Sequence, residues 1–356
     1  MKFDFFTDRM PPLVGVDISS TSVKMVELAE GVRGSYRLEG YAIAALSKDA
    51  VVDGSIADLD QVADAVKRAW KQLGTREKRL ALALPAATVI SKKVLMQAGL
   101  REEDMELQVE AEANQYIPFS LDEVNIDFQT LGPAPNNPDE VEVLIAASRK
   151  EKIEDRVAAA EGAGLKVVIM DVETYATETA YTLIANQLPN NGNNQTVMIV
   201  DIGALMIHIN VLHDNKSVYT REQNFGGAQL TQEIQRRFGL SPEEAEIAKR
   251  KGGLPDSYEL EVLQPFVQSL ALEVARAVQF FTSSTQYNQV DHIVLAGGCA
   301  SIPAIDVVVQ ERTQVNTIVA NPFNAMSFGT RFKQQQLAAD ASALIIACGL
   351  AMRRFD

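Results

Sequence analysis

The chain has little cysteine, histidine or positive charge, and each shortage excludes a class of protein. Only two cysteines, Cys299 and Cys348, occur in 356 residues, and neither lies in a CxxC motif. A disulfide framework or a zinc site is therefore not expected. The three histidines, His208, His213 and His292, have no metal-ligand spacing. The formal net charge of -14 opposes binding to nucleic acid, because phosphate groups attract basic surfaces.

Uninterrupted apolar runs are also short. The first ten residues, MKFDFFTDRM, contain charges and lack the apolar core that a signal peptide needs. Residues 343–352, ALIIACGLAM, cover about half of the ~20 residues that cross a bilayer, so we expect a buried helix there. The scarcity of cysteine in turn predicts a reducing environment.

The N-terminal region favours a sheet covered by a helix. Its apolar patterns predict strands at residues 13–19, 22–29 and 36–44. Apolar residues at helical spacing predict a helix that begins near Leu59, and residues 79–85 predict a buried strand ending at a proline. A chain of this length exceeds what one core usually organises, so two or more domains are expected.

A segment of different character follows, from about residue 88 to residue 166. It predicts three strands and two helices, with the polar stretch PAPNNPDE (residues 133–140) as an exposed hairpin loop. Near residue 196 the opening pattern of the chain returns, because the apolar stretch TVMIVDIG carries Asp201 where LVGVDIS carries Asp17. Such long-period self-similarity predicts two related halves that face each other.

Asp17 and Asp201 each follow an apolar strand and precede a tight turn. Magnesium keeps most of its waters and needs few carboxylates, so one aspartate from each half could hold it. The hydroxyl and N-H groups of Ser19, Ser20, Thr21 and Ser22 could bind phosphate oxygens, and Lys24 could add a positive charge. The alternative is that Asp17 caps a turn and that the Ser/Thr run is an ordinary flexible turn.

Two glycine doublets each precede a predicted helix. They are Gly226 with Gly227 and Gly297 with Gly298. Glycine permits close backbone approach, and the free N-H groups of a helix N-terminus favour phosphate oxygens. Simple turn chemistry is the alternative explanation for each doublet.

A third candidate feature is the helix that begins after the N-cap residue Ser241. Proline follows at the first helical position, as is typical of helix starts. Glu246 and Lys249 are three residues apart and share a face of this helix. The two side chains could bind a ribose hydroxyl or an adenine edge, or they could form a plain surface ion pair.

The order of these features resembles that of the actin-like ATPase superfamily, which includes actin, Hsp70, sugar kinases and FtsA. The resemblance covers nearly the whole chain and implies an α/β fold: two RNase H-like halves around a nucleotide cleft, with an FtsA-like inserted α+β module. In that superfamily the two Asp loops bind phosphates and the later AGG motif binds adenosine. The implied division is residues 1–87, 167–195 and 335–356 for the first half, 88–166 for the module, 196–240 and 288–334 for the second-half core, and 241–287 for a helical subdomain.

The sequence of the inserted module points to one family within this superfamily. Residues 104–129, DMELQVEAEANQYIPFSLDEVNIDFQ, with GVDISSTSVKMVEL before them and VEVLIAASRKEKIEDR after them, are similar to the PilM family of type IV pilus assembly. That implies a cytoplasmic protein that binds ATP and Mg2+ and is recruited to the inner membrane, where it holds the cytoplasmic N-terminal peptide of PilN. It also implies links to the pilus motor ATPases and platform protein, a role in twitching motility, and the option of a homodimer.

The chain departs from the superfamily in its second Asp loop, which usually carries hydroxyls. Here Ala204 and three larger apolar residues follow Gly203, so only backbone donors remain, and slow or absent hydrolysis is expected. Glu173, at the start of a predicted helix, is the candidate for polarising the attacking water, although it could instead cap that helix. A small-molecule or sugar kinase and a filament-forming protein are the alternative functions on this fold.

Overall fold

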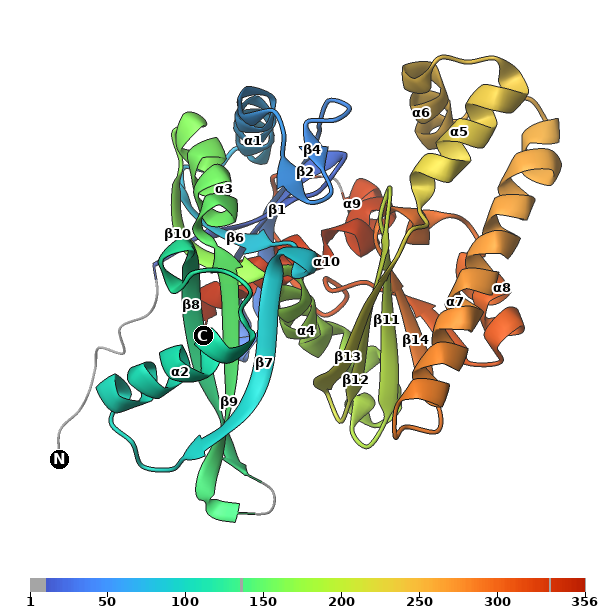
Figure 1. Cartoon of the computed structure of the whole chain (residues 1–356). Coiled ribbons are helices and arrows are strands. Elements are labelled where there is room, and N and C mark those ends of the chain that lie inside the picture. Colours follow the sequence, from blue (N-terminus) through green and yellow to red (C-terminus); the bar gives the residue numbers. More distant parts are fainter. Residues whose placement is uncertain (1–10, 135–136, 333, 356) are drawn as a thin grey trace.

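Two large mixed sheets, each with helices packed on it, form most of the molecule (Figure 1). The computed structural model describes residues 11–134, 137–332 and 334–355. The first ten residues, for which no signal peptide is predicted, and the tip of the loop predicted at 133–140 lie outside these residues. Both sheets begin with the same arrangement, in which a buried strand pairs antiparallel with the next strand along the chain. The two related halves predicted from the sequence are therefore confirmed.

The first sheet has six strands. Their spatial order is β10 (Lys166–Val172), β6 (Arg79–Leu84), β1 (Val14–Ile18), β2 (Ser22–Glu30), β3 (Tyr36–Ala45) and β16 (Ser327–Phe328). Strands β10, β6 and β1 are parallel, and β1, β2 and β3 form an antiparallel meander. Because helices cover both faces, the central strands are continuous apolar runs. Strand β16 comes from a part of the chain that the predicted division places in the second half.

Helices cover the first sheet on both faces. α1 (Leu59–Leu73) and α3 (Lys150–Gly162) pack on one face, next to the small hairpin of β4 (Val51–Val52) and β5 (Ser55–Ile56). α4 (Glu173–Ile184) and α10 (Ile345–Met352) share a core with strands of both sheets. These two helices therefore join the two halves.

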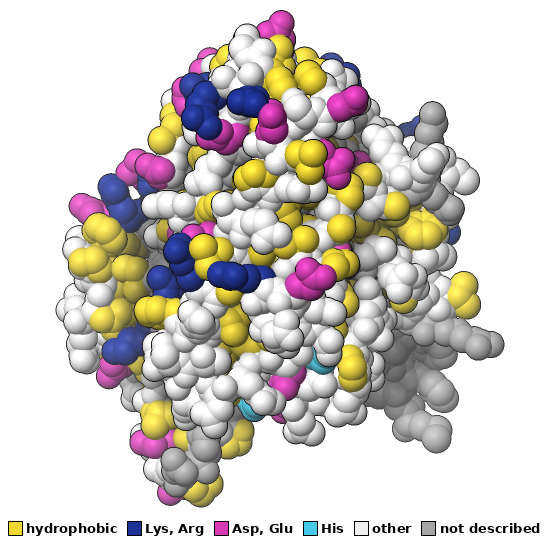
Figure 2. Space-filling model, turned by 90° about the vertical axis from the view of Figure 1, so that its right-hand side faces the viewer, with side chains coloured by type: hydrophobic (Ala, Val, Ile, Leu, Met, Phe, Trp, Pro, Cys, Tyr) yellow, Lys and Arg dark blue, Asp and Glu magenta, His cyan; other side chains and the backbone are white. Residues whose placement is uncertain are grey.

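The second sheet has five strands. Their order is β13 (Lys216–Gln223), β12 (Ile207–His213), β11 (Thr196–Ile202), β14 (His292–Ala296) and β15 (Asn316–Val319). Helices on this half are α5 (Gly227–Phe238), α6 (Pro242–Lys251), α7 (Gln264–Ser284) and α8 (Ile305–Thr313). Figure 2 shows the side of the molecule on the right in Figure 1, where positive, negative and apolar side chains all reach the surface.

The inserted module is a three-stranded antiparallel sheet with a helix. Its strands are β7 (Val89–Gln97), β9 (Asn137–Arg149) and β8 (Val124–Ala134), with α2 (Glu102–Tyr116) packed against them. The predicted hairpin exists, but the loop predicted at 133–140 is too long, because β8 and β9 stay paired as far as Ala134 and Asn137. Pro133 is tolerated because β8 is an edge strand.

The C-terminal helix is buried, as the sequence predicts. Every residue of α10 is buried. The helical stretch Gln335–Phe355, to which it belongs, is long and apolar enough to cross a membrane by length and composition, but 67% of its most apolar window is buried in the protein. This is the property of a core helix between two halves.

Candidate functional site

Asp17 is a buried, ion-paired carboxylate at the end of β1. Its side chain accepts a hydrogen bond of 2.7 Å from Lys24 Nζ, which lies on β2 directly opposite in the strand register. The turn between the strands is closed by Ser19, whose N-H and hydroxyl both donate to the carbonyl of Ser22. The turn is therefore ordered by its own hydroxyls, and Ser20 and Thr21 form its tip.

Asp201 occupies the corresponding place at the end of β11. The following loop is closed by a hydrogen bond from Gly203 N-H to the carbonyl of Met206, and it exposes Leu205. In the strand register Asp201 lies opposite His208 on β12, whose Nδ1 is 3.3 Å from Glu222 Oε1 on β13. Burial by itself would lower the pKa of His208. The hydrogen bond to Glu222 and the charge of Asp201 outweigh burial and raise this pKa to about 9. A positive imidazole therefore stands beside this carboxylate.

The carboxylates of the two halves share one electrostatic environment. Burial raises the pKa of Asp201, His208 and Lys24 lower it, and Asp17 raises it again. Burial also raises the pKa of Glu173, at the first residue of α4, to about 7, and the negative charge of Asp17 adds to the effect. Asp17, Asp201 and Glu173 are thus close enough to perturb one another. Within the described residues, no three His, Cys, Asp or Glu side chains converge as they would around a fully protein-ligated metal.

The first glycine doublet packs against the second Asp loop, and the N-H groups of its second glycine and of the next residue donate to carbonyls of that loop. The N-H of Gly227 donates to the carbonyl of Gly203 at 3.0 Å, and the N-H of Ala228 donates to the carbonyl of Ala204 at 2.8 Å. A Cβ atom on Gly226 would lie 2.5 Å from the Ala204 oxygen. Glycine is required here so that α5 can begin against this loop.

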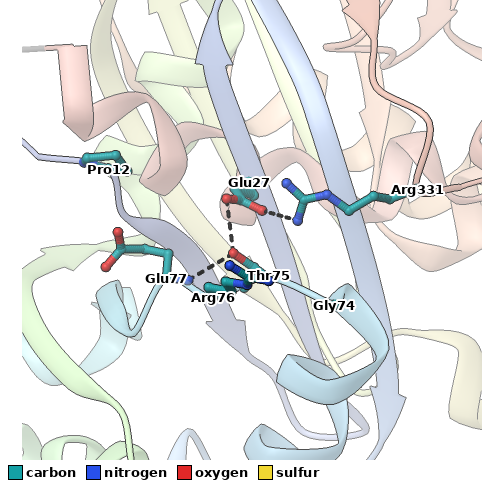
Figure 3. Close-up of a pocket in the computed structure, with 7 residues that line it drawn as sticks. All are labelled: Pro12, Glu27, Gly74, Thr75, Arg76, Glu77 and Arg331. Atoms are coloured by element: carbon teal, nitrogen blue, oxygen red, sulfur yellow. Dashed lines mark hydrogen bonds and ion pairs between the residues drawn. The ribbon is translucent and has the colours of Figure 1, made fainter.

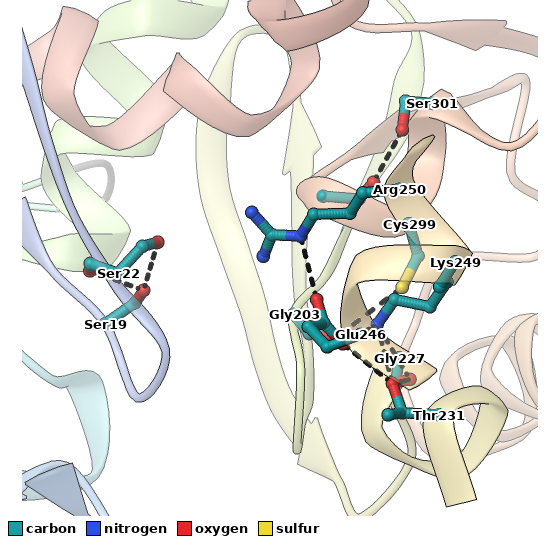
Figure 4. A network of polar contacts seen from close by, with 11 residues as sticks. Ser19, Ser22, Gly203, Gly227, Thr231, Glu246, Lys249, Arg250, Cys299 and Ser301 are labelled. Atoms are coloured by element: carbon teal, nitrogen blue, oxygen red, sulfur yellow. Dashed lines mark hydrogen bonds and ion pairs between the residues drawn. The ribbon is translucent and has the colours of Figure 1, made fainter. Parts of the chain in front are cut away.

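Glu246 and Lys249 form an ion pair of 2.5 Å that is tied to α5 (Figure 4). The hydroxyl of Thr231 donates to Glu246 and accepts from Lys249, each at 2.8 Å. Burial raises the pKa of Glu246, but the hydrogen bond and charge of Lys249 outweigh it and lower the pKa overall. The pair is more than a surface contact, because it joins α6 to the start of α5.

The second glycine doublet contains one residue pressed against Asp201. Gly297 has a φ of +85°, and a Cβ atom there would lie 2.4 Å from Asp201 Oδ1. The N-H of Gly297 donates to the carbonyl of Ser342 at 2.8 Å, so the segment before α10 holds this turn in place. Gly298 has open space around its Cα. The AGG motif and the second Asp loop are therefore in direct contact.

Two residues of this region were not predicted from the sequence. Arg156 on α3 is 2% exposed and donates to the carbonyls of Ile18 and Gly54. Glu222 on β13 has its pKa lowered mainly by its hydrogen bond to His208, and the backbone N-H of Ala87, in the first half, also lowers it. No local pattern marks either residue, since their partners are far away along the chain.

A mostly apolar cavity of about 350 Å³ lies beside the inserted module. We call it the module groove, and its principal lining residues are Ile90, Ile117, Pro118, Phe119, Arg149 and Lys152. The guanidinium of Arg149 stands 5.5 Å from the ring centre of Phe119, which is 39% exposed. Three consecutive residues that follow α2, Ile117, Pro118 and Phe119, therefore form one wall of this groove.

A polar cavity of about 390 Å³ lies at the opposite end of β1 (Figure 3). Its central carboxylate, Glu27, accepts hydrogen bonds from Thr75 at 3.0 Å and from Arg331 at 2.8 Å. These partners satisfy the carboxylate. In open α/β sheets ligands bind at the carboxyl ends of the strands, so this cavity is a poorer candidate than the region around Asp17.

Two sheets of this topology, each with an acidic residue at the end of its first strand, define the actin-like ATPase fold. A family model described as type IV pilus assembly protein PilM matches residues 15–355. The chain therefore belongs to the PilM family of type IV pilus assembly proteins. A solved structure of a PilM-PilN type IV pilus biogenesis complex is similar with a TM-score of 0.79 and 26% identity, over 97% of this chain and 98% of that one.

More distant similarities agree with the fold. The cell division protein FtsA of Bacillus subtilis (strain 168) is 21% identical over 353 residues, which cover 87% of this chain and 78% of FtsA. The ethanolamine utilization protein EutJ from Carboxydothermus hydrogenoformans is similar with a TM-score of 0.56 and 17% identity, over 96% of this chain and 89% of that one. The actin-like fold expected from the sequence is confirmed.

Proposed function

We propose that this protein is a cytoplasmic, ATP-binding scaffold of type IV pilus assembly that holds the N-terminal cytoplasmic peptide of PilN. The observation that carries the proposal is the whole-chain similarity to a PilM solved in complex with PilN. Binding to that peptide recruits the protein to the inner membrane. From there it couples the membrane complex to the pilus motor ATPases and the platform protein.

The module groove has the chemistry that a short apolar peptide requires. Its wall offers Ile117, Pro118 and the half-exposed ring of Phe119, while Arg149 and Lys152 stand at its border. Apolar side chains of a peptide would fill the cavity, and its carbonyl or carboxylate oxygens would accept from the two cations. Aromatic and arginine side chains are common among the interface residues that contribute most of the binding energy.

The region around Asp17 and Asp201 fits Mg-ATP. Asp17 and Asp201 would hold the hydrated Mg2+, since the described residues offer two carboxylates here rather than a closed ligand cage. Ser20 and Thr21 at the turn tip, Lys24, and the backbone of Gly203 and Ala204 would face the phosphates. Gly297 and Gly298 would border the adenosine, with Glu246 and Lys249 nearby. The metal would neutralise the negative charge of the phosphates, and the residues of the chain would orient the nucleotide.

Slow or absent hydrolysis follows from the same residues. Glu173 would have to accept a proton from water, but its pKa of about 7 leaves it partly protonated near neutrality. The apolar side chain of Leu205 in the second Asp loop donates no hydrogen bond to a transferred phosphoryl group. We therefore propose that nucleotide binding, rather than turnover, changes the surface presented to PilN.

Isothermal titration tests both ligands. The protein is titrated with Mg-ATP, and then with a synthetic peptide of the PilN cytoplasmic N-terminus in the presence and absence of Mg-ATP. Both are expected to bind, and Asp201→Asn is expected to weaken Mg-ATP at least about tenfold, the equivalent of 1.4 kcal/mol. Absence of Mg-ATP binding by the native protein would remove the nucleotide part of the proposal.

The groove is tested with a matched pair of variants. Phe119→Ala removes a ring that lines the groove, and Leu107→Ala removes a 66% exposed side chain of α2 in the same module. We expect Phe119→Ala to raise the Kd of the peptide about fivefold or more, the cost of truncating an interface residue worth about 1 kcal/mol or more. Leu107→Ala should leave the Kd unchanged. Equal affinities for the two variants would place the peptide elsewhere.

A further inference from the structure

Arg156 connects the inserted module to the first Asp loop. Its side chain is 2% exposed, and it comes from α3, which follows β9 of the module without an intervening loop. One terminal nitrogen donates to the carbonyl of Ile18, the residue after Asp17, at 3.4 Å. The other donates to the carbonyl of Gly54, in the turn between β4 and β5, at 3.1 Å.

Burying the guanidinium group of Arg156 costs free energy, because its charge loses contact with water. Within the described part of the chain, no carboxylate lies within the 4.0 Å of a salt bridge with Arg156, and burial lowers its pKa while Glu173 and Asp17 raise it from further away. An apolar side chain would fill the same volume without that desolvation cost. The planar fork of arginine, however, can hold two carbonyl groups from separate elements at a fixed spacing.

The same helix also reaches the module groove. Lys152 lies one turn before Arg156 on α3, borders the groove, and donates to the hydroxyl of Ser55 at 3.0 Å. Ser55 is next to Gly54, whose Cα packs so closely on Pro85 that a Cβ atom would lie 2.9 Å from that ring. Pro85 precedes Ala87 and Thr88, which also line the groove. A continuous set of contacts therefore runs from the groove through α3 and the β4–β5 turn to Ile18.

We propose that Arg156 is a positioning residue that couples the module groove to the nucleotide site by holding the end of β1 at a fixed position relative to α3. This rests on the function proposed above for the groove and for Asp17. A ligand in the groove displaces or fixes Lys152 and the start of α3, and Arg156 carries that change to the carbonyl beside Asp17. By linkage, Mg-ATP at Asp17 must then alter the affinity of the groove by the same factor.

The coupling factor is the ratio of the peptide Kd values measured without and with saturating Mg-ATP. Allosteric factors are typically about 5 to 150, so we expect a ratio of about 5 or more, or its reciprocal, in the native protein. In Arg156→Met the ratio should fall to about 1 while the peptide and Mg-ATP each still bind. Arg156→Lys, which keeps the charge but loses the fork, should give an intermediate ratio. A ratio in Arg156→Met equal to the native one would overturn the proposal.

Hydrogen exchange separates this proposal from the proposed function. Mg-ATP should slow amide exchange in the β4–β5 turn and in α3 of the native protein, but not of Arg156→Met. Lys150→Met, on the same helix and bonded to the Asp122 carbonyl of the module, is the matched control and should behave as native. Failure of the peptide to bind, with this protection present, would contradict the groove assignment and leave the role of Arg156 supported. Identical protection in Arg156→Met and Lys150→Met would contradict the role of Arg156, and thermal unfolding of both verifies that they fold.

Discussion

At the scale of single residues, glycine at 297 is required by geometry rather than by flexibility. With a φ of +85° and a ψ of 174°, Gly297 lies in a backbone region that is open almost only to glycine. Any Cβ atom would also displace the Asp201 carboxylate. The glycine at position 297 therefore allows the backbone of the AGG motif to lie against the Asp201 carboxylate.

We predict that Gly297→Ala weakens Mg-ATP binding and lowers the melting temperature. The strained backbone alone costs about 1–3 kcal/mol, and the shifted Asp201 would no longer face the proposed metal position. Gly298→Ala is the matched control for stability, since nothing lies within 4 Å of its Cβ position. Thermal unfolding without ligand compares the stability of the two variants, and the shift that Mg-ATP causes in Gly297→Ala and in the native protein compares their binding. Equal stability of the two variants would show that the close contact is unimportant.

The ion pair of Asp17 and Lys24 determines how the proposed metal-binding role of Asp17 should be tested. Removing one partner leaves the other charge buried, which costs about 3–5 kcal/mol. We predict that Asp17→Asn is markedly destabilised and that the double variant Asp17→Asn with Lys24→Met recovers much of that loss. Denaturant unfolding measures this, and full native stability in Asp17→Asn would contradict the ion pair. Neither variant should bind Mg-ATP like the native protein.

At the scale of elements, α10 approaches its neighbours so closely that its backbone touches theirs. A Cβ atom on Gly349 would lie 1.8 Å from the carbonyl oxygen of Ala176 on α4, and one on Gly15 of β1 would lie 2.1 Å from the carbonyl of Ala347. These contacts fix the helices that join the two halves. The apolar residues of α10 are thus buried by packing against α4 and β1.

Gly349→Ala is predicted to be strongly destabilising, because the crossing of α10 and α4 must open to admit the methyl group. Forcing extra volume into a packed core typically costs about 1–3 kcal/mol and more where the backbone must move. Circular dichroism during heating would record a clearly lower midpoint. A midpoint like that of the native protein would mean that the two helices are farther apart than described here.

Most strands and helices near the candidate site could be predicted, because their signals are local. The buried runs of β1, β6 and β11 and the periodicity of α1 are continuous in sequence. The N-cap at Ser241, which starts α6, was likewise recognisable, and in the structure it forms part of a capping box with Glu244. Burial and local hydrogen bonding fix these elements, so sequence patterns find them.

What could not be predicted depends on contacts between distant residues. Arg156 looks like any charge on an amphipathic helix, yet its partner Ile18 is 138 positions away. The glycine doublet at 226 and 227 indicated close backbone approach, but the sequence did not show that the neighbour is Ala204, whose carbonyl accepts from Ala228 in α5. The extent of β8 and β9 was underestimated because proline and asparagine mark a turn but do not show how far pairing continues.

At the scale of the whole molecule, the two halves touch outside their shared helices through Glu222. Its carboxylate accepts from His208 of the second half and interacts with the backbone N-H of Ala87 in the first. Ala87 also lines the module groove. Ala87 is therefore a residue of the first half that contacts the second half and also lines the groove.

We predict that Glu222→Gln weakens Mg-ATP binding by about tenfold. A hydrogen bond to a charged group contributes roughly 1.5–3 kcal/mol, and without it fewer molecules hold the arrangement that binds nucleotide. Fluorescence titration with a labelled ATP analogue measures the change. Native affinity in Glu222→Gln would show that the contact does not influence the relative position of the halves.

The most direct test of the account is a crystal structure of the protein with Mg2+ and a non-hydrolysable ATP analogue. The account predicts the metal between the carboxylates of Asp17 and Asp201, bound mainly through water, with the triphosphate passing the turn at Ser20 and the adenosine beside Gly298. A nucleotide bound elsewhere, or a metal that approaches neither aspartate, would contradict it.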